Sequence, residues 1–119
     1  MEPTATSLPD RLRVHLITLA RRGATTTYAD VARVMRLHPP HTIQQVAAAL
    51  ETLIEEDVAA GVPPVAALVL APWRGGLPAP GFFDCARRLL GYGGPDEGRQ
   101  ASAFHAELLR QATAHWAMR

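Results

Sequence analysis

The sequence predicts a mainly α-helical protein with a small β wing, namely a winged helix-turn-helix followed by two further helices. Three observations lead to this fold class. Two capped helical patterns are separated only by the short turn at residues 38–41, a short apolar run bounded by prolines follows them, and a Gly-Gly turn comes next. At 119 residues we expect a single domain, 1–119, with a helical C-terminal extension from about residue 80.

The first predicted helix covers Leu8–Arg22. Its leucines recur at helical spacing, whereas its arginines mostly fall elsewhere, which indicates an amphipathic helix that ends at Gly23. The following run, residues 24–28, is rich in threonine and predicts a brief strand, because β-branched residues suit a pleated backbone.

The first helix of the helix-turn-helix is predicted to begin after Thr27. Thr27 is a typical N-cap, and Asp30 is placed three residues later to reach back as in a capping box. We expect this helix to stop near Leu37, because the prolines at 39 and 40 disfavour its continuation.

The second helix, residues 42–60, has the most regular apolar periodicity of the chain. Thr42 is its predicted N-cap, with Gln45 at the third position after it. Gly61 and the proline pair that follows are expected to end the helix.

The predicted wing follows this helix. Residues 65–70 are continuously apolar between prolines and are predicted to form a buried strand, and Trp73–Gly76 is predicted to be a tight turn. The chain from Leu77 would then return beside the strand as a hairpin. Two more helices are expected over Phe82–Leu90 and from about Asp96 to Met118.

Composition narrows the possible partners only slightly. The formal net charge is +1, yet residues 1–50 hold six arginines against three acids, and an acidic block follows over residues 51–57. This distribution is compatible with phosphate binding and equally with a solvated surface. All 12 basic residues are arginine, which we attribute to a GC-rich genome and thus to a small protein of bacterial type.

The location is predicted to be cytoplasmic. No apolar run approaches the roughly 20 residues that span a bilayer, so no membrane partner is expected, and the first ten residues lack the basic and apolar regions of a secretion signal. Cys85 is the only cysteine, which excludes an internal disulfide and any multi-cysteine zinc site.

The segment Thr26-Thr-Tyr-Ala-Asp-Val-Ala32 is similar to the Thr-Tyr-Gly-Glu-Ile-Ala opening of the winged-helix domain in alkylguanine-DNA alkyltransferases and alkyltransferase-like proteins. The likeness continues through Val46–Leu50, which resembles that family's recognition helix, and through a proline-led strand with a Gly-Gly turn. It covers about residues 24–82. The resemblance implies a winged-helix fold and docking on DNA.

The chain departs from that family where the family carries its chemistry. The family's Pro-Cys-His-Arg motif aligns with Pro63-Pro-Val-Ala66, which has neither the thiol nor the imidazole. Alkyl transfer needs a thiolate nucleophile and a base that activates it. The sequence therefore gives no support to alkyl transfer. The residues of this motif with which alkyltransferase-like proteins bind a lesion are also absent, so lesion recognition has no support either.

The helix over residues 42–60 is the predicted reader of a DNA groove. Its N-terminal exposed positions would reach base edges first, because the acids from Glu51 onward would repel phosphates. Glutamine can pair with adenine, and threonine can contact a base edge or a methyl group. The candidate base-contacting residues are His41, Thr42, Gln44, Gln45 and Ala48. The alternative is that both glutamines are ordinary solvated residues, with Gln45 used in capping.

Three arginines are candidate phosphate contacts. Arg33 and Arg36 lie away from the buried side of the preceding helix, and Arg74 lies at the tip of the predicted wing. Each arginine alone is more typical of a solvated surface. Six to ten phosphate contacts mark tight binders, so we expect weak binding by a monomer, or binding as a homodimer or beside another protein.

Other residues offer no further chemistry. Cys85 lies among phenylalanines and is predicted to be a small buried hydrophobe. Trp73 is either a stacking platform for a base or, as is more common at a hairpin, a cover for the core. No histidine pair has metal-binding spacing, and no nucleophile, base and orienting group cluster in the sequence. We therefore predict no catalytic site, metal or cofactor.

Two functions are favoured by the sequence, whereas a third, an enzyme with an unfamiliar site, has little support because no catalytic groups cluster in the sequence. The first is a non-enzymatic winged-helix protein that binds double-stranded DNA through the N-terminal end of helix 42–60 and through the wing. The second is a protein-interaction module built on the same scaffold, because fold alone does not choose between them.

Overall fold

The structure is a computed structural model, and it describes residues 7–118. This part of the chain contains five α-helices and one sheet of two parallel strands. The prediction of a mainly helical protein is therefore confirmed. In chain order the elements are α1 (Leu8–Arg21), β1 (Thr26–Thr27), α2 (Tyr28–Val34), α3 (Thr42–Ala59), η1 (Val65–Leu68), β2 (Val69–Leu70), η2 (Pro72–Arg74), α4 (Pro80–Leu90) and α5 (Arg99–Ala117), where η denotes a 3-10 helix.

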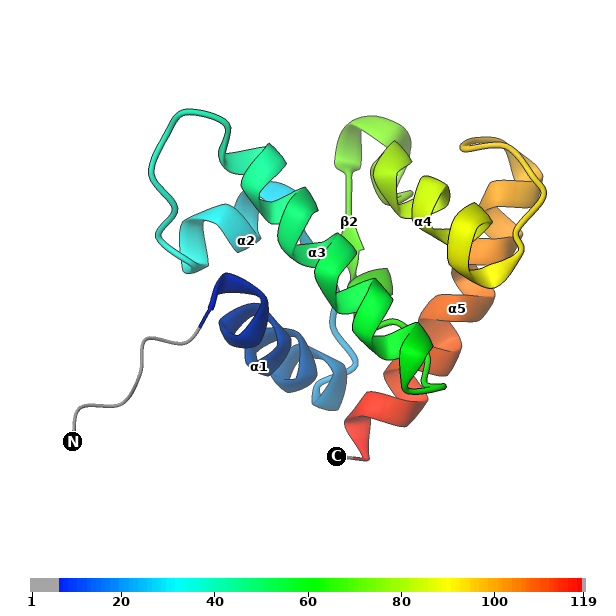
Figure 1. The fold of residues 1–119 in the computed structure, drawn as a ribbon, viewed down its shortest axis with the longest axis horizontal. Helices are drawn as coiled ribbons and strands as arrows, with labels where there is room; N and C mark the ends of the chain where they lie inside the picture. The colour runs from blue at the N-terminus through cyan, green and yellow to red at the C-terminus, as the bar shows by residue number, and fades with distance from the viewer. Residues whose placement is uncertain (1–6, 119) are drawn as a thin grey trace.

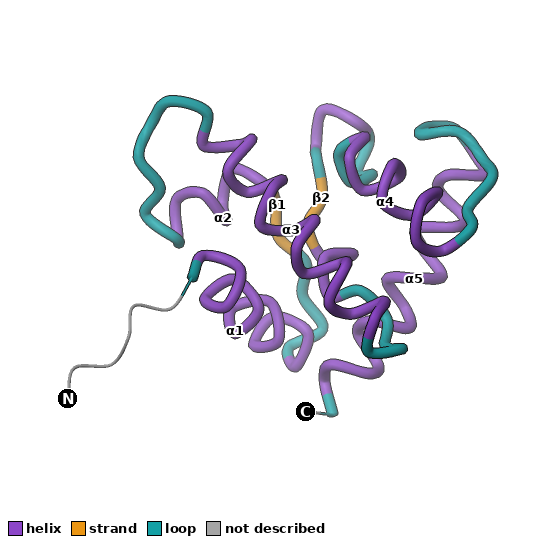
Figure 2. Tube along the Cα trace, viewed as in Figure 1, coloured by secondary structure: helices purple, strands orange, loops and turns teal. Residues whose placement is uncertain are grey.

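Helix α3 runs through the middle of the molecule, with α1 and α2 on one side and α4 and α5 on the other (Figure 1). The two short strands lie near the centre, and the turn η1 contacts α1, α3 and α5 (Figure 2). The core between them is mainly apolar, and the buried polar side chains of the described residues are Asp57 and His105. Its largest fully buried side chains include Leu12, Leu16, Leu53, Leu68 and Phe83.

Two of the helix starts follow from side-chain caps. The Ser7 hydroxyl accepts a hydrogen bond from the Asp10 amide at 3.2 Å, and the Thr27 hydroxyl accepts one from the Asp30 amide at 3.1 Å. The prediction that Thr27 is an N-cap is therefore confirmed. Asp30 does not reach back to close a capping box, because its carboxylate pairs with Arg33 at 2.7 Å.

The predicted cap of α3 is wrong. The residue before the helix is His41, which has a left-handed backbone (φ 65°), and no side chain caps the first turn. Thr42 is already helical, so its hydroxyl is not placed to accept from the third amide. Gln45 holds the preceding loop instead, because its Nε2 donates to the carbonyls of His38 at 3.0 Å and Pro40 at 3.2 Å.

The predicted strand over residues 65–70 is only partly correct. Residues 65–68 form the buried turn η1, and only Val69 and Leu70 pair as a strand, with Thr26 and Thr27. A continuous apolar run does not by itself distinguish a buried strand from another buried conformation. Here side chains from α3 and α5 bond to the backbone of η1, so this backbone has no need of a sheet partner.

The predicted hairpin is reduced to a single antiparallel bridge between Ala71 and Leu77. The Ala71 amide donates to the Leu77 carbonyl at 2.8 Å, and η2 fills the turn between them. Gly75 and Gly76 both have positive φ there, as predicted for the turn. We call residues 71–77 the wing loop.

Three helix boundaries differ by two residues or more from those predicted. Helix α2 ends at Val34 because Arg36 turns left-handed and the Leu37 amide bonds back to the Ala32 carbonyl, a common C-terminal motif. Helix α4 begins earlier, at Pro80, since proline suits a first helical position. Helix α5 begins later, at Arg99, after Gly98 with φ 93°.

Candidate nucleic-acid interface

The first two turns of α3 form an exposed surface without acidic side chains. His41, Gln44 and Ala48 are exposed, whereas Thr42 and Gln45 are half-buried. No side chain caps this end and no acid lies in its first turn. The first amides of α3 thus have no side-chain acceptor within residues 7–118, and the partial positive charge of a helix N-terminus favours an anion.

The two glutamines have different roles. Gln45 is committed to the loop carbonyls described above, so its amide is not free to read a base. Gln44 makes no side-chain hydrogen bond within residues 7–118 and points to solvent. Of the two, Gln44 is the residue able to meet a base edge.

Two exposed arginines, Arg33 on α2 and Arg36 just after it, lie at the start of the loop that leads into α3. Arg33 is 73% exposed and pairs with Asp30 one turn away, an exposed contact that is easily exchanged for another anion. Arg36, just past the end of α2, is exposed and makes no ion pair within the described part of the chain. Its guanidinium is therefore available.

A third arginine, Arg11 of α1, contacts the end of α2. Arg11 Nη1 donates to the Met35 carbonyl at 3.5 Å, a long contact that places its exposed side chain beside the α2–α3 loop. No local pattern marks Arg11 as a site residue, because a tertiary contact between α1 and the loop brings it there. We define the basic corner as Arg11, Arg33 and Arg36 together with the loop histidines His38 and His41.

Arg74 does not join this corner. Its Nε donates to the Pro78 carbonyl at 2.8 Å, and its guanidinium also bonds to the Asp96 carbonyl. The side chain thus secures the wing loop to the loop before α5. Both acceptors are carbonyls, so the charge of Arg74 is not neutralised by a carboxylate through these bonds.

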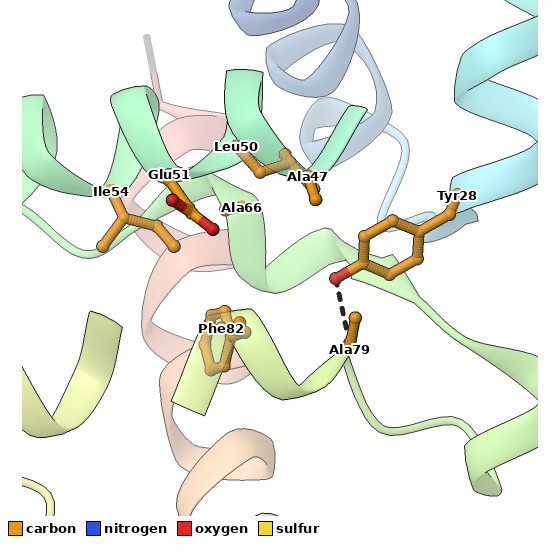
Figure 3. Close-up of a pocket in the computed structure, with 9 residues that line it drawn as sticks. Tyr28, Ala47, Leu50, Glu51, Ile54, Ala66, Ala79 and Phe82 are labelled. Carbon is orange, nitrogen blue, oxygen red and sulfur yellow. Dashed lines mark hydrogen bonds between the residues drawn. The ribbon is translucent and has the colours of Figure 1, made fainter. Parts of the chain in front are cut away.

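A narrow slot lies between α3 and α4, with Tyr28 at one end (Figure 3). The Tyr28 hydroxyl accepts a hydrogen bond from the Ala79 amide at 2.9 Å, and burial raises the pKa of this phenol, so it remains protonated at neutral pH. Apolar side chains such as Leu50 and Phe82 form the walls, and Glu51 adds the one carboxylate. We call this cavity the Tyr28–Glu51 slot.

The slot has about 20 Å³ for water-sized groups. A cavity of about 10–15 Å³ on this measure holds one water molecule. A nucleobase is far larger, so the slot as it stands does not accept one.

The exposure of Cys85 and Trp73 decides between the roles considered for each. Cys85 is 3% exposed, which confirms that it is a small buried hydrophobe, and burial raises the pKa of its thiol. Trp73 is 64% exposed, so the expectation that it covers the core is wrong.

Residues 7–118 contain no group of three side chains suited to hold a metal ion. None of the helices in this part of the chain has the length and apolarity to span a bilayer.

Comparisons with known proteins returned no match to a family model, to a curated protein or to a solved structure. The likeness to the alkyltransferase winged-helix domain therefore rests on the quoted residues alone.

Proposed function

We propose that this chain is a small non-enzymatic DNA-binding protein that docks on a duplex through the N-terminal end of α3. The observation that carries the proposal is the uncapped first turn of α3 beside the basic corner. Backbone amides, a helix dipole and arginine side chains there all favour phosphate.

The fold supports this proposal as a reduced winged helix. The order of a helix, a short strand, two helices, a second strand and a wing loop corresponds to that predicted for a winged helix-turn-helix. In this arrangement α3 is the recognition helix and α2 carries the supporting phosphate contacts. The likeness to the alkyltransferase-like domain points the same way.

Base contacts fall to the exposed part of the first turn. Gln44 is the residue suited to pair with adenine, and His41 and Thr42 lie close enough along the chain to contact neighbouring bases or phosphates. Gln45 acts indirectly, because it fixes the loop that carries the histidines.

The proposed affinity of one molecule is low. The basic corner offers three arginines, and three neutralised phosphates give a log–log salt slope of about −3. Tight binding would need a second copy or another DNA-binding protein alongside.

The cytoplasmic location stays a prediction from the sequence.

The test is a salt titration of binding to a mixed-sequence duplex, followed by fluorescence anisotropy. Arg36→Glu is expected to weaken binding and reduce the slope by about 1 or more, because one phosphate contact is lost and a repulsion is added. Arg99→Glu makes the same charge change at the start of α5, away from α2, and should bind nearly as the wild type does. No salt-sensitive binding by the wild type at low ionic strength overturns the proposal.

A protein-interaction role is the second candidate, and the exposure of Trp73 favours it. The double variant Arg33→Glu/Arg36→Glu separates the two functions. DNA binding predicts its loss of duplex affinity, whereas the interaction role predicts an unchanged partner complex. Arg74 is left out of this test, because reversing its charge would break the bonds that secure the wing loop.

A further inference from the structure

The acidic residues of α3 differ in whether a cation neutralises them. Those at 55, 56 and 57 are paired with arginines from α1 or α4, but Glu51 has no ion pair within residues 7–118. The three pairs are Glu55–Arg88 at 3.2 Å, Glu56–Arg13 at 3.0 Å and Asp57–Arg13 at 2.7 Å. Glu51 is therefore the uncompensated carboxylate of this helix.

Glu51 stands at the Tyr28–Glu51 slot, opposite the first turn of α4. Gly81 leaves room for it: a Cβ at this position would lie 3.2 Å from Glu51 Oε2. In Figure 3 the Glu51 carboxylate and the Tyr28 hydroxyl lie apart along the slot, with Leu50 and Ala47 between them on α3 and Phe82 below Glu51 on α4. The slot thus has two separated polar oxygens among apolar side chains.

One exposed ring, that of Trp73, contacts the buried Tyr28 ring that lines the slot. The rings of Trp73 and Tyr28 are tilted by 54° with centroids 6.2 Å apart. The wing loop that carries Trp73 is held by the Ala71–Leu77 bridge and by the bonds of Arg74, so the indole is presented on a fixed support. Aromatic faces attract cations and cover aliphatic chains.

We propose that the Tyr28–Glu51 slot binds the ammonium group of a lysine side chain from a partner protein. Glu51 supplies the opposite charge, the Tyr28 oxygen supplies an acceptor, and the exposed Trp73 ring beside Tyr28 covers the aliphatic stem. An ammonium group is close to water in size and fits the space, whereas a guanidinium is broader. None of the 119 residues is a lysine, so this segment does not supply the ligand itself.

The test uses n-butylammonium chloride as the probe, because it reproduces the end of a lysine side chain. Binding to the full chain is followed by NMR shifts of the Trp73 indole N–H and the Gly81 amide. We expect saturable shifts, and at least about fivefold weaker binding of n-butanol, the neutral counterpart, because charge and hydrogen bonding both contribute. Butylguanidinium should also bind at least about fivefold more weakly because of its size.

The variants locate the charge. Glu51→Gln keeps the shape and is expected to weaken butylammonium binding at least about fivefold, whereas Glu55→Gln, one turn along α3 and already paired with Arg88, should change it less than twofold. Smaller losses for Glu51→Gln, or n-butanol binding as tightly as butylammonium, overturn the proposal. A pentapeptide Gly-Gly-Lys-Gly-Gly with blocked ends should shift the same two signals, and acetylation of its lysine should abolish the effect.

DNA binding and lysine binding are tested separately. The butylammonium titration contains no nucleic acid, so its outcome stands whether or not the duplex titration succeeds.

Discussion

Arg13 Nη1 lies 2.7 Å from Asp57 Oδ1, and this contact ties α1 to the last turn of α3. The second oxygen of Asp57 accepts a hydrogen bond from the Val65 amide at 2.9 Å, at the start of η1. The Arg13 guanidinium also lies over the Trp116 ring of α5, 5.2 Å from its centroid. The buried Asp57 carboxylate therefore joins α1, α3 and η1, and its partner Arg13 extends the contact to α5.

Removing the Asp57 carboxylate should lower the free energy of unfolding substantially. In Asp57→Ala the Val65 amide is left buried without its acceptor, and the half-buried Arg13 loses its closest partner. We expect a loss of about 3–5 kcal/mol in the free energy of unfolding, as for breaking other buried pairs. Urea denaturation measures it. Glu56→Ala removes the exposed partner of Arg13 and should cost no more than about 1 kcal/mol; equal losses in the two variants would contradict this account.

Thr27, before α2, and Thr42, in α3, should differ in how much their replacement by alanine lowers the free energy of unfolding. Thr27→Ala removes the hydroxyl that accepts from the Asp30 amide and should cost about 1 kcal/mol. Thr42 has no such bond, so Thr42→Ala should cost less than about 0.5 kcal/mol. A loss near 1 kcal/mol in both variants would contradict the finding that no side chain caps the first turn of α3.

Local signals explain what could be predicted from the sequence. The apolar periodicity of α3, the cap at Thr27 and the burial of Cys85 each depend on neighbours within one or two turns, and all three are confirmed. A mainly helical fold follows from several such signals together.

Tertiary contacts explain what could not be predicted. Residues 65–68 form a turn because Asp57 and His105 bond to its backbone, and neither partner is visible in the apolar run itself. Arg74 is bound to carbonyls from a later loop, so it could not be recognised as structural. Arg11 joins the basic corner only because α1 packs beside the α2–α3 loop.

His105 predicts a pH dependence of stability. Burial lowers the pKa of His105, opposed in part by its 2.9 Å hydrogen bond to the Ala67 carbonyl, in which Nε2 donates in the neutral tautomer. The folded state thus favours the neutral ring. Its stabilising contribution is complete above the ordinary histidine pKa near 6.5 and declines as the pH falls below it, because the unfolded chain takes up the proton first.

His105→Gln should remove that part of the pH dependence. At pH 7 the variant is expected to be less stable than the wild type by about 1 kcal/mol or more, because the buried Ala67 carbonyl loses its hydrogen bond with the His105 ring. The difference should narrow between pH 7 and pH 5. Free energies of unfolding from urea titrations at several pH values measure this, and parallel curves for the two proteins would exclude His105 as the cause.

Cys85 should be protected from thiol reagents in the folded protein. Its side chain is 3% exposed, and burial, followed by the nearby Glu51 charge, raises the pKa of its thiol, so little reactive thiolate is present. Reaction with Ellman's reagent then requires local or global opening, and we expect it to be at least ~100-fold slower than in the urea-unfolded chain. Absorbance of the released thiolate follows the rate. A native rate within tenfold of the unfolded one would show that α4 opens readily and does not bury this thiol in solution.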